Sequence, residues 1–157
     1  SKKIDKLILE SASFGIKGER ARKIRFEEDL KLCSLIEQDY SKFLQKWENN
    51  ELFINQRDRN PVGFKNQQIE RLSHDKRQLA KALMSFSQGA VKAFDKKNFK
   101  IYGSVELISG QEDRKYFDLN KKMGSLIDSA THHVIRSCGH NTHLERPAKF
   151  IEILNKC

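Results

Sequence analysis

The chain of 157 residues is strongly basic, with 30 Lys and Arg against 21 Asp and Glu and a formal net charge of +9 at pH 7. Its three cysteines are odd in number and far apart, which excludes the pattern of a secreted disulfide scaffold. No apolar run reaches the length of a signal peptide or a membrane span. We therefore expect one folded cytoplasmic domain over residues 1–157, with a fragment of a larger protein as the alternative because the sequence begins at Ser1.

The first half of the chain predicts helices joined by turns. Apolar residues at 4–9 suggest a short opening helix that ends before Gly15 and Gly18. A spacing of three and four predicts a long helix with one buried face over residues 21–47. A loop rich in turn-forming residues follows at 49–64. The clearest stripe predicts a helix over 66–94, with these residues on its buried face: Ile69, Leu72, Leu79, Leu83, Phe86, Ala90 and Phe94.

The second half changes pattern once and then returns to helical spacing. Alternating apolar residues predict one short extended segment near 99–108, for which no second strand is evident. The third long helix is expected over 113–138, with Asp113 as its N-cap and Gly139 at its end. A last helix is expected to begin at Pro147. The predicted fold is all-α, a single-domain bundle of four or five helices.

The positive charge is concentrated in two segments, with 8 basic against 3 acidic residues in 1–25 and 11 against 4 in 56–100. Such an excess attracts polyanions. The favoured interpretation is a domain that binds DNA or RNA through the phosphate backbone, and a solvated basic face is the simpler alternative. The expected phosphate contacts are Arg71, Arg77, Lys81, Lys92, Lys96 and Lys97 with Arg20, Arg22, Lys23 and Arg25.

Four of the five histidines lie between Asp128 and His143, where a second interpretation arises. Arg136 and His143 are separated by six residues, a spacing that resembles the Arg-x4-6-His motif of HEPN-domain ribonucleases. The resemblance implies a compact helical dimer that cleaves RNA without metal, with Arg136 and His143 as catalytic residues. It departs from the family in that Ser137 follows the arginine and Gly139 interrupts the motif.

A weaker alternative for the same stretch is a zinc site, because Cys138, His140 and His143 are all competent ligands. The spacing supplies no second cysteine or carboxylate at a recognisable offset, so no metal is the preferred prediction. No glycine-rich phosphate loop or Gly-x-Ser-x-Gly motif occurs either, so we expect no cofactor. The third interpretation is a helical docking or recruitment domain of a larger machine, whose basic face meets an acidic protein partner.

Overall fold

The computed structural model describes residues 4–94 and 103–157, which fold into two compact units. The first unit takes in the chain up to Phe14, residues 51–65 and the chain after Phe94, and the second takes in residues 15–50 and 66–94. The first unit contains a β-sheet, so the predicted all-α bundle is wrong. Within the described ranges, no helix combines the length and the hydropathy that crossing a bilayer requires.

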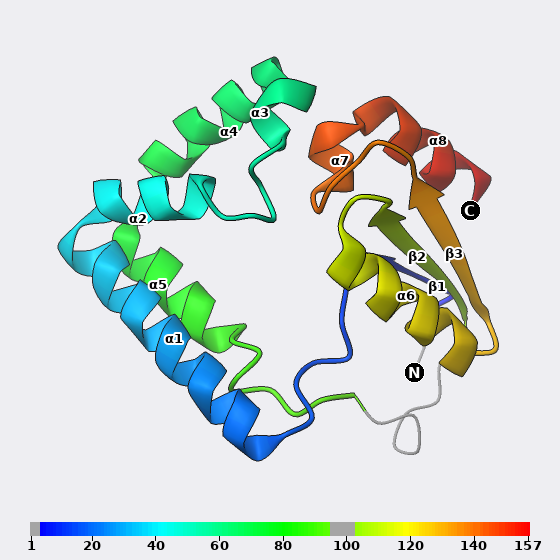
Figure 1. The fold of residues 1–157 in the computed structure, drawn as a ribbon, viewed down its shortest axis with the longest axis horizontal. Helices are drawn as coiled ribbons and strands as arrows, with labels where there is room; N and C mark the ends of the chain where they lie inside the picture. Colours follow the sequence, from blue (N-terminus) through cyan, green and yellow to red (C-terminus); the bar gives the residue numbers. More distant parts are fainter. Residues whose placement is uncertain (1–3, 95–102) are drawn as a thin grey trace. The chain divides into compact units, whose positions relative to one another are not determined.

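The sheet of the first unit has three parallel strands in the order β1-β2-β3 (Figure 1). They are β1 (Lys6–Glu10), β2 (Ser104–Gly110) and β3 (Ala130–Ile135). In the register, Ile8 pairs with Glu106 and Ile108 pairs with His133. Parallel neighbours need a crossover connection, and helix α6 (Arg114–Leu126) makes the one between β2 and β3. The carboxyl ends of all three strands therefore meet at one edge.

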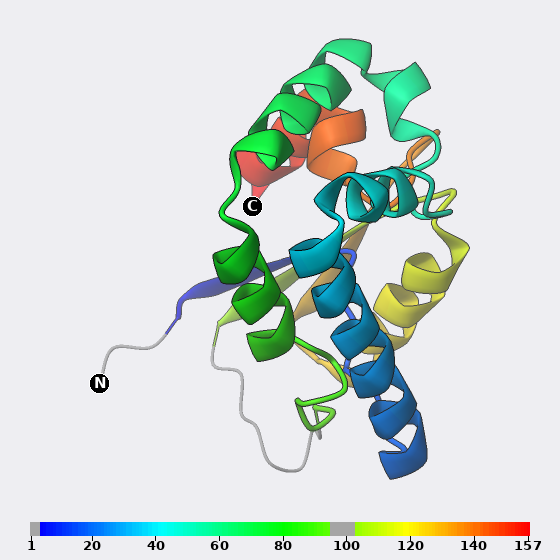
Figure 2. The same ribbon diagram turned by 90° about the vertical axis from the view of Figure 1, so that its left-hand side faces the viewer.

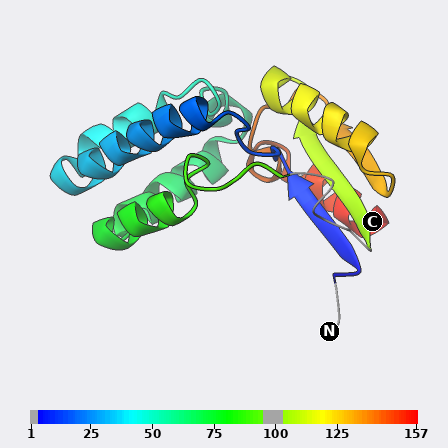
Figure 3. The same ribbon diagram turned by 90° about the horizontal axis from the view of Figure 1, so that it is seen from below.

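Helices cover both faces of this sheet (Figure 3). Val105 and Leu107 pack on one face with Met123 of α6. Ile108 and Ile135 pack on the other face with apolar side chains of α8 (Pro147–Lys156). Strands buried on both faces read as continuous apolar runs, which explains why the alternation at residues 105–108 looked weak. The part of the expected extended segment before Gly103 lies outside the described residues.

The predicted helix over 113–138 is half right. Its N-cap at Asp113 is confirmed, since the carboxylate accepts a hydrogen bond from Tyr116 N at 3.3 Å. The helix ends at Leu126, however, and Ala130–Ile135 is strand β3. Ala130 and Val134 continue the helical spacing only by coincidence, because both lie on strand β3, where Ala130 packs with Met123 of α6. The expected start of the last helix at Pro147 is confirmed by α8.

The opening segment is also a strand, so the predicted helix at 4–9 is wrong. Five residues of β1 gain their hydrogen-bond partners from β2, almost a hundred positions further along the chain. A short apolar segment cannot reveal such a distant partner. The expected loop at 49–64 instead contains α3 (Gln56–Arg59) and the start of α4 (Pro61–Ser73). Helix α7 (Thr142–Glu145) precedes α8.

The second unit is helical, as expected, but its helices are shorter. The predicted helix 21–47 is α1 (Glu19–Gln38) followed by α2 (Tyr40–Glu48), because Asp39 leaves helical geometry and caps α2. The predicted helix 66–94 is divided before Asp75, which caps α5 (Lys76–Ser85). Figure 2 shows α1 and α5 side by side. The core of the second unit joins residues of α1, α2 and α5, and they are Cys33, Ile36, Tyr40, Phe43 and Ala80.

The expected buried stripe of residues 66–94 holds only in part. Leu79 and Leu83 pack against the core of the second unit. Ile69, Leu72 and Phe86 are exposed, at 59%, 70% and 84%. Helix α4 ends at Ser73, α5 begins at Lys76, and Phe86 follows the end of α5, so no single helix carries the predicted stripe.

Candidate active site

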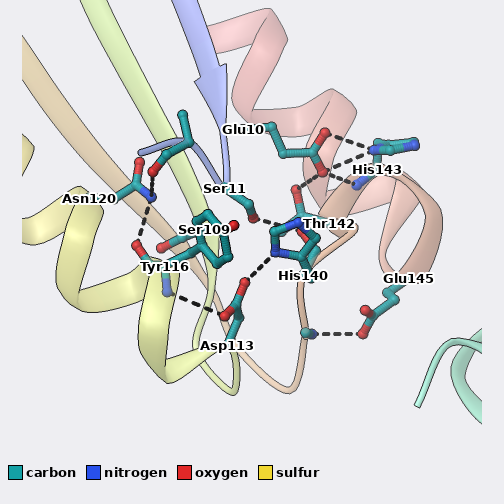
Figure 4. Close-up of polar contacts among 12 residues, drawn as sticks. Glu10, Ser11, Ser109, Asp113, Tyr116, Asn120, His140, Thr142, His143 and Glu145 are labelled. Carbon is teal, nitrogen blue, oxygen red and sulfur yellow. Dashed lines mark hydrogen bonds and ion pairs between the residues drawn. The ribbon is translucent and has the colours of Figure 1, made fainter. Parts of the chain in front are cut away.

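An acid and a histidine meet where β2 and β3 end (Figure 4). Asp113 follows the carboxyl end of β2, and His140 follows the carboxyl end of β3. Asp113 Oδ2 lies 2.6 Å from His140 Nδ1. The carboxyl edge of a parallel sheet is the usual place for a binding site in α/β folds. The fold therefore brings together two chemically active groups that are 27 residues apart in the chain.

Asp113 is held by the helix that it caps. Its Oδ1 accepts from Tyr116 N, while its Oδ2 contacts the histidine. Its side chain is almost fully buried, at 3% exposed. Helix α6 thus fixes the direction in which the carboxylate points.

His140 is held through its backbone and its ring. Ser11 Oγ, just after β1, donates to the His140 carbonyl oxygen at 2.7 Å. The ring lies 4.5 Å from the Tyr116 ring and 5.9 Å from the Phe53 ring, measured between centroids. These contacts limit the imidazole to a narrow range of orientations.

Glycine is required at the two turns that carry the pair. A Cβ at Gly110 would lie 2.0 Å from Gly139 O, and one at Gly139 would lie 2.7 Å from Glu145 Oε1. Glu112 N also donates to Cys138 O at 2.9 Å. The two loops can pack this closely only because Gly110 has no side chain, while the absence of one at Gly139 leaves room for the Glu145 carboxylate.

A buried ion pair supports the residue before the histidine. Glu145 Oε2 accepts from Gly139 N at 2.7 Å. The Arg59 guanidinium donates to both Glu145 and Glu112. Glu145 is 2% exposed, so its charge is compensated by Arg59 and by the backbone amide.

The pair opens into a pocket of the first unit. Besides Asp113 and His140, its lining includes Leu52, Asn55, Arg59, Glu112 and Arg114. Both charged and apolar groups are therefore present next to the histidine.

This arrangement favours general base chemistry at His140. When Nδ1–H donates to the Asp113 carboxylate, Nε2 is the nitrogen that can accept a proton. The carboxylate then stabilises the imidazolium that forms. An acid and a histidine in this relation are two of the three members of an acid–histidine–nucleophile triad.

A second histidine, His143, pairs with Glu10 at the end of β1. His143 Nδ1 lies 2.7 Å from Glu10 Oε2, and Thr142 Oγ1 donates to Glu10 Oε1 at 2.7 Å. The hydrogen bond to Glu10 raises the pKa of His143, although burial opposes it. Burial acts to raise the pKa of Glu10, but the hydrogen bonds from His143 and Thr142 outweigh it and lower that pKa.

The expected catalytic pair Arg136 and His143 is not joined. His143 bonds Glu10, and within the described part of the chain the exposed Arg136 has no hydrogen bond or ion pair to His143.

The three weak zinc candidates, Cys138, His140 and His143, do not form a cluster either. Cys138 is fully buried, and burial with the nearby Glu145 raises its pKa to about 12, while His140 bonds Asp113.

Several of the expected phosphate contacts are occupied within the protein. Arg22 donates to Lys17 O at 3.0 Å, Arg25 pairs with the buried Asp29 at 2.9 Å, and Arg71 pairs with Glu48 at 3.6 Å. The remaining candidates that the structure describes are exposed, and they are Arg20, Lys23, Arg77, Lys81 and Lys92. Lys96 and Lys97 lie outside the described residues.

Sequence reasoning missed the pair of Asp113 and His140, assigning the first only as a helix cap and the second as a weak metal ligand. A usable signal was present. An apolar run ends in Gly110 and is followed by Asp113, and after the next helix a second apolar run is followed by Gly139 and His140. Two such runs read as parallel strands would have placed both residues at one sheet edge.

The chain resembles known proteins in sequence and in fold. No family model matches the chain. The chain is 28% identical over 156 residues to a Bacillus subtilis (strain 168) protein named putative 2-succinyl-6-hydroxy-2,4-cyclohexadiene-1-carboxylate synthase, covering 98% of this chain and 57% of that protein. It is also 28% identical over 166 residues to Protein PHYLLO, chloroplastic, from Arabidopsis thaliana, covering 99% of this chain and 10% of that protein. The chain thus spans little more than half of the Bacillus relative.

Solved structures define the fold class. MenH from S. aureus matches with a TM-score of 0.89 and 28% identity, covering 98% of this chain and 58% of that one. A thermophilic esterase from Thermogutta terrifontis matches with a TM-score of 0.72 and 16% identity, covering 97% and 54%. These neighbours have the α/β-hydrolase fold, and the three parallel strands and helices of this chain match little more than half of it. The relatives point to an enzyme, so the nucleic-acid-binding, HEPN ribonuclease and docking interpretations are wrong.

Proposed function

We propose that this chain supplies the acid and the histidine of an α/β-hydrolase-type active site, with His140 as the general base and Asp113 as the residue that orients it. The contact of 2.6 Å between Asp113 Oδ2 and His140 Nδ1 carries the proposal. Its position at the carboxyl ends of neighbouring parallel strands supports it, because this edge holds the reactive groups of α/β enzymes.

The order of the two residues also supports the proposal. On the α/β-hydrolase fold, the triad follows the chain order nucleophile, acid, histidine. Asp113 precedes His140 in agreement with that order, and the 157 residues contain no Gly-x-Ser-x-Gly elbow. We infer that the nucleophile lies in the part of the relatives' length that these residues do not match.

For the reaction, we propose the synthesis of 2-succinyl-6-hydroxy-2,4-cyclohexadiene-1-carboxylate. The similarity to the Bacillus synthase and to S. aureus MenH supports this choice over a general esterase. The named product carries a ring carboxylate and a succinyl carboxylate, so it is a dianion at neutral pH. A net charge of +9 favours the approach of such an anion.

The test uses the complete gene product that contains these residues. His140→Ala and Asp113→Asn should each lower kcat for formation of the named product by roughly a hundredfold to ten-thousandfold, because a positioned base and its orienting group are lost. His74→Ala is the matched control, since His74 is exposed in the second unit. Activity of both active-site variants within a few-fold of the parent would overturn the proposal, and an active parent that makes a different product would overturn only the choice of reaction.

A further inference from the structure

Three possible metal ligands gather on the α8 side of the sheet. Glu106 lies on β2, His133 on β3, and Cys157 directly after α8. Side chains alternate along a strand, so Glu106 shares a face with Ile108, and His133 shares one with Ile135. Those two apolar residues pack with the α8 side chains. Glu106 and His133 therefore point to the same face of the sheet, and the end of α8 places Cys157 beside them.

Their distances suit a small cation. His133 Nε2 lies 2.8 Å from Glu106 Oε2 and 3.9 Å from Cys157 Sγ, and all three ligand atoms lie within 4.8 Å of one another. Zinc bonds of about 2.0–2.3 Å in a tetrahedron separate neighbouring ligand atoms by roughly 3.3–3.6 Å. The distances from His133 Nε2 to Glu106 Oε2 and to Cys157 Sγ would each have to change by well under an ångström to reach this spacing.

We propose that Glu106, His133 and Cys157 form a zinc-binding site with one open position for water or a further ligand. The donor set of thiolate, imidazole and carboxylate favours zinc over magnesium or calcium, which prefer oxygen alone. A thiolate and a carboxylate neutralise the two positive charges of the ion. Without metal, the same residues make a half-buried Glu106–His133 pair beside a protonated thiol.

The environment of the thiol is consistent with this change. Burial and the nearby Glu106 raise the pKa of Cys157, while Lys6 of β1 acts in the opposite direction. Metal binding must therefore release the thiol proton, so uptake should strengthen as pH rises. The positive charge of Lys6 would also repel a zinc ion bound at Cys157.

The site is separate from the acid–histidine pair. Glu106 lies four residues before Gly110, which at about 3.3 Å per residue places it roughly 13 Å from the carboxyl end of β2. An ion bound there would join the end of α8 to the middle of the sheet. The proposed site does not depend on the proposed synthase activity.

The test is metal uptake by the complete, metal-free protein, using cobalt(II) alone and zinc(II) alone as probes. Cobalt should give a thiolate charge-transfer band in the near ultraviolet and the visible bands of a tetrahedral ion, and zinc should displace it at one ion per chain. Cys157→Ser should abolish the charge-transfer band. Glu106→Gln and His133→Gln should each weaken binding by at least about tenfold.

Two controls make the result decisive. Cys33→Ser changes a buried thiol of the second unit, and it should leave the cobalt spectrum unchanged. Zinc should also protect Cys157 of the parent protein from alkylation, which is read by mass spectrometry and needs no variant. A parent that takes up no cobalt or zinc, or a Cys157→Ser variant with the parental spectrum, would overturn the proposal whether or not the enzyme is active.

Discussion

Glu145 accepts a hydrogen bond from Gly139 N at 2.7 Å, and this contact joins α7 to the residue that precedes His140. Because Glu145 is buried and paired with Arg59, its carboxylate organises the loop that carries the histidine. The relationship gives the first prediction.

Glu145→Ala should destabilise the protein by about 1–3 kcal/mol, because Gly139 N and part of the Arg59 guanidinium lose their partner in a buried place. Urea unfolding of the complete protein measures this change. Glu152→Ala removes an exposed carboxylate that pairs with Lys149 and Lys156 on the surface, and it should shift the midpoint far less. Equal midpoints for the two variants would show that the buried pair does not support the loop.

Gly139→Ala should lower kcat for the proposed reaction more than it raises KM. The added Cβ would lie 2.7 Å from Glu145 Oε1, so either the Glu145 side chain or the loop must shift, and both changes disturb the support of His140. Gly18→Ala is the matched control, because its Cβ meets only the Ala21 side chain at 3.8 Å. A Gly139→Ala enzyme with parental kcat would contradict the tight packing of these loops.

The coupling between Glu10 and His143 should depend on pH. The raised pKa of His143 contributes stability that is present below 6.5 and is lost as pH rises through the folded value. The lowered pKa of Glu10 contributes stability that is present above 4.5 and is lost as pH falls through its folded value. The coupling is therefore largest between these two values.

A double-mutant cycle with Glu10→Gln and His143→Gln measures that coupling. We expect less than about 1 kcal/mol near pH 5.5, since half of the His143 side chain is exposed to solvent, and a smaller value at pH 8. A coupling energy that grows from pH 5.5 to pH 8 would contradict the prediction, because His143 loses its positive charge as pH rises.

Ser87→Ala should destabilise the second unit by about 1–2 kcal/mol. Ser87 Oγ donates to Asp29 Oδ2 at 2.7 Å, and Asp29 is fully buried. Removal of the Ser87 hydroxyl therefore takes a hydrogen bond from a buried carboxylate oxygen. Ser85→Ala, at an exposed position, is the control. Thermal unfolding followed by circular dichroism separates the two, and coincident curves would remove Ser87 from the support of Asp29.

Local signals in the sequence determined the caps and the amphipathic helices. Asp113 and Pro147 were placed correctly at helix starts, because a cap depends on residues within one turn. The helical character of 21–47 and of much of 66–94 was also readable, since one face of each helix packs against a core. The breaks at Asp39 and Asp75 were missed, although both residues are good caps.

Only the tertiary structure decided the sheet and the site. Strand β1 has its partner almost a hundred residues away, so the sequence does not reveal the pairing. The strands are covered on both faces, so the weak alternation near 99–108 was the one sign of a strand. The same parallel pairing brings Asp113 and His140 to one edge and gathers Glu106 and His133 with Cys157 on one face. Composition and spacing could identify histidines and acids as reactive groups, but which acid faces which histidine depends on contacts between distant segments.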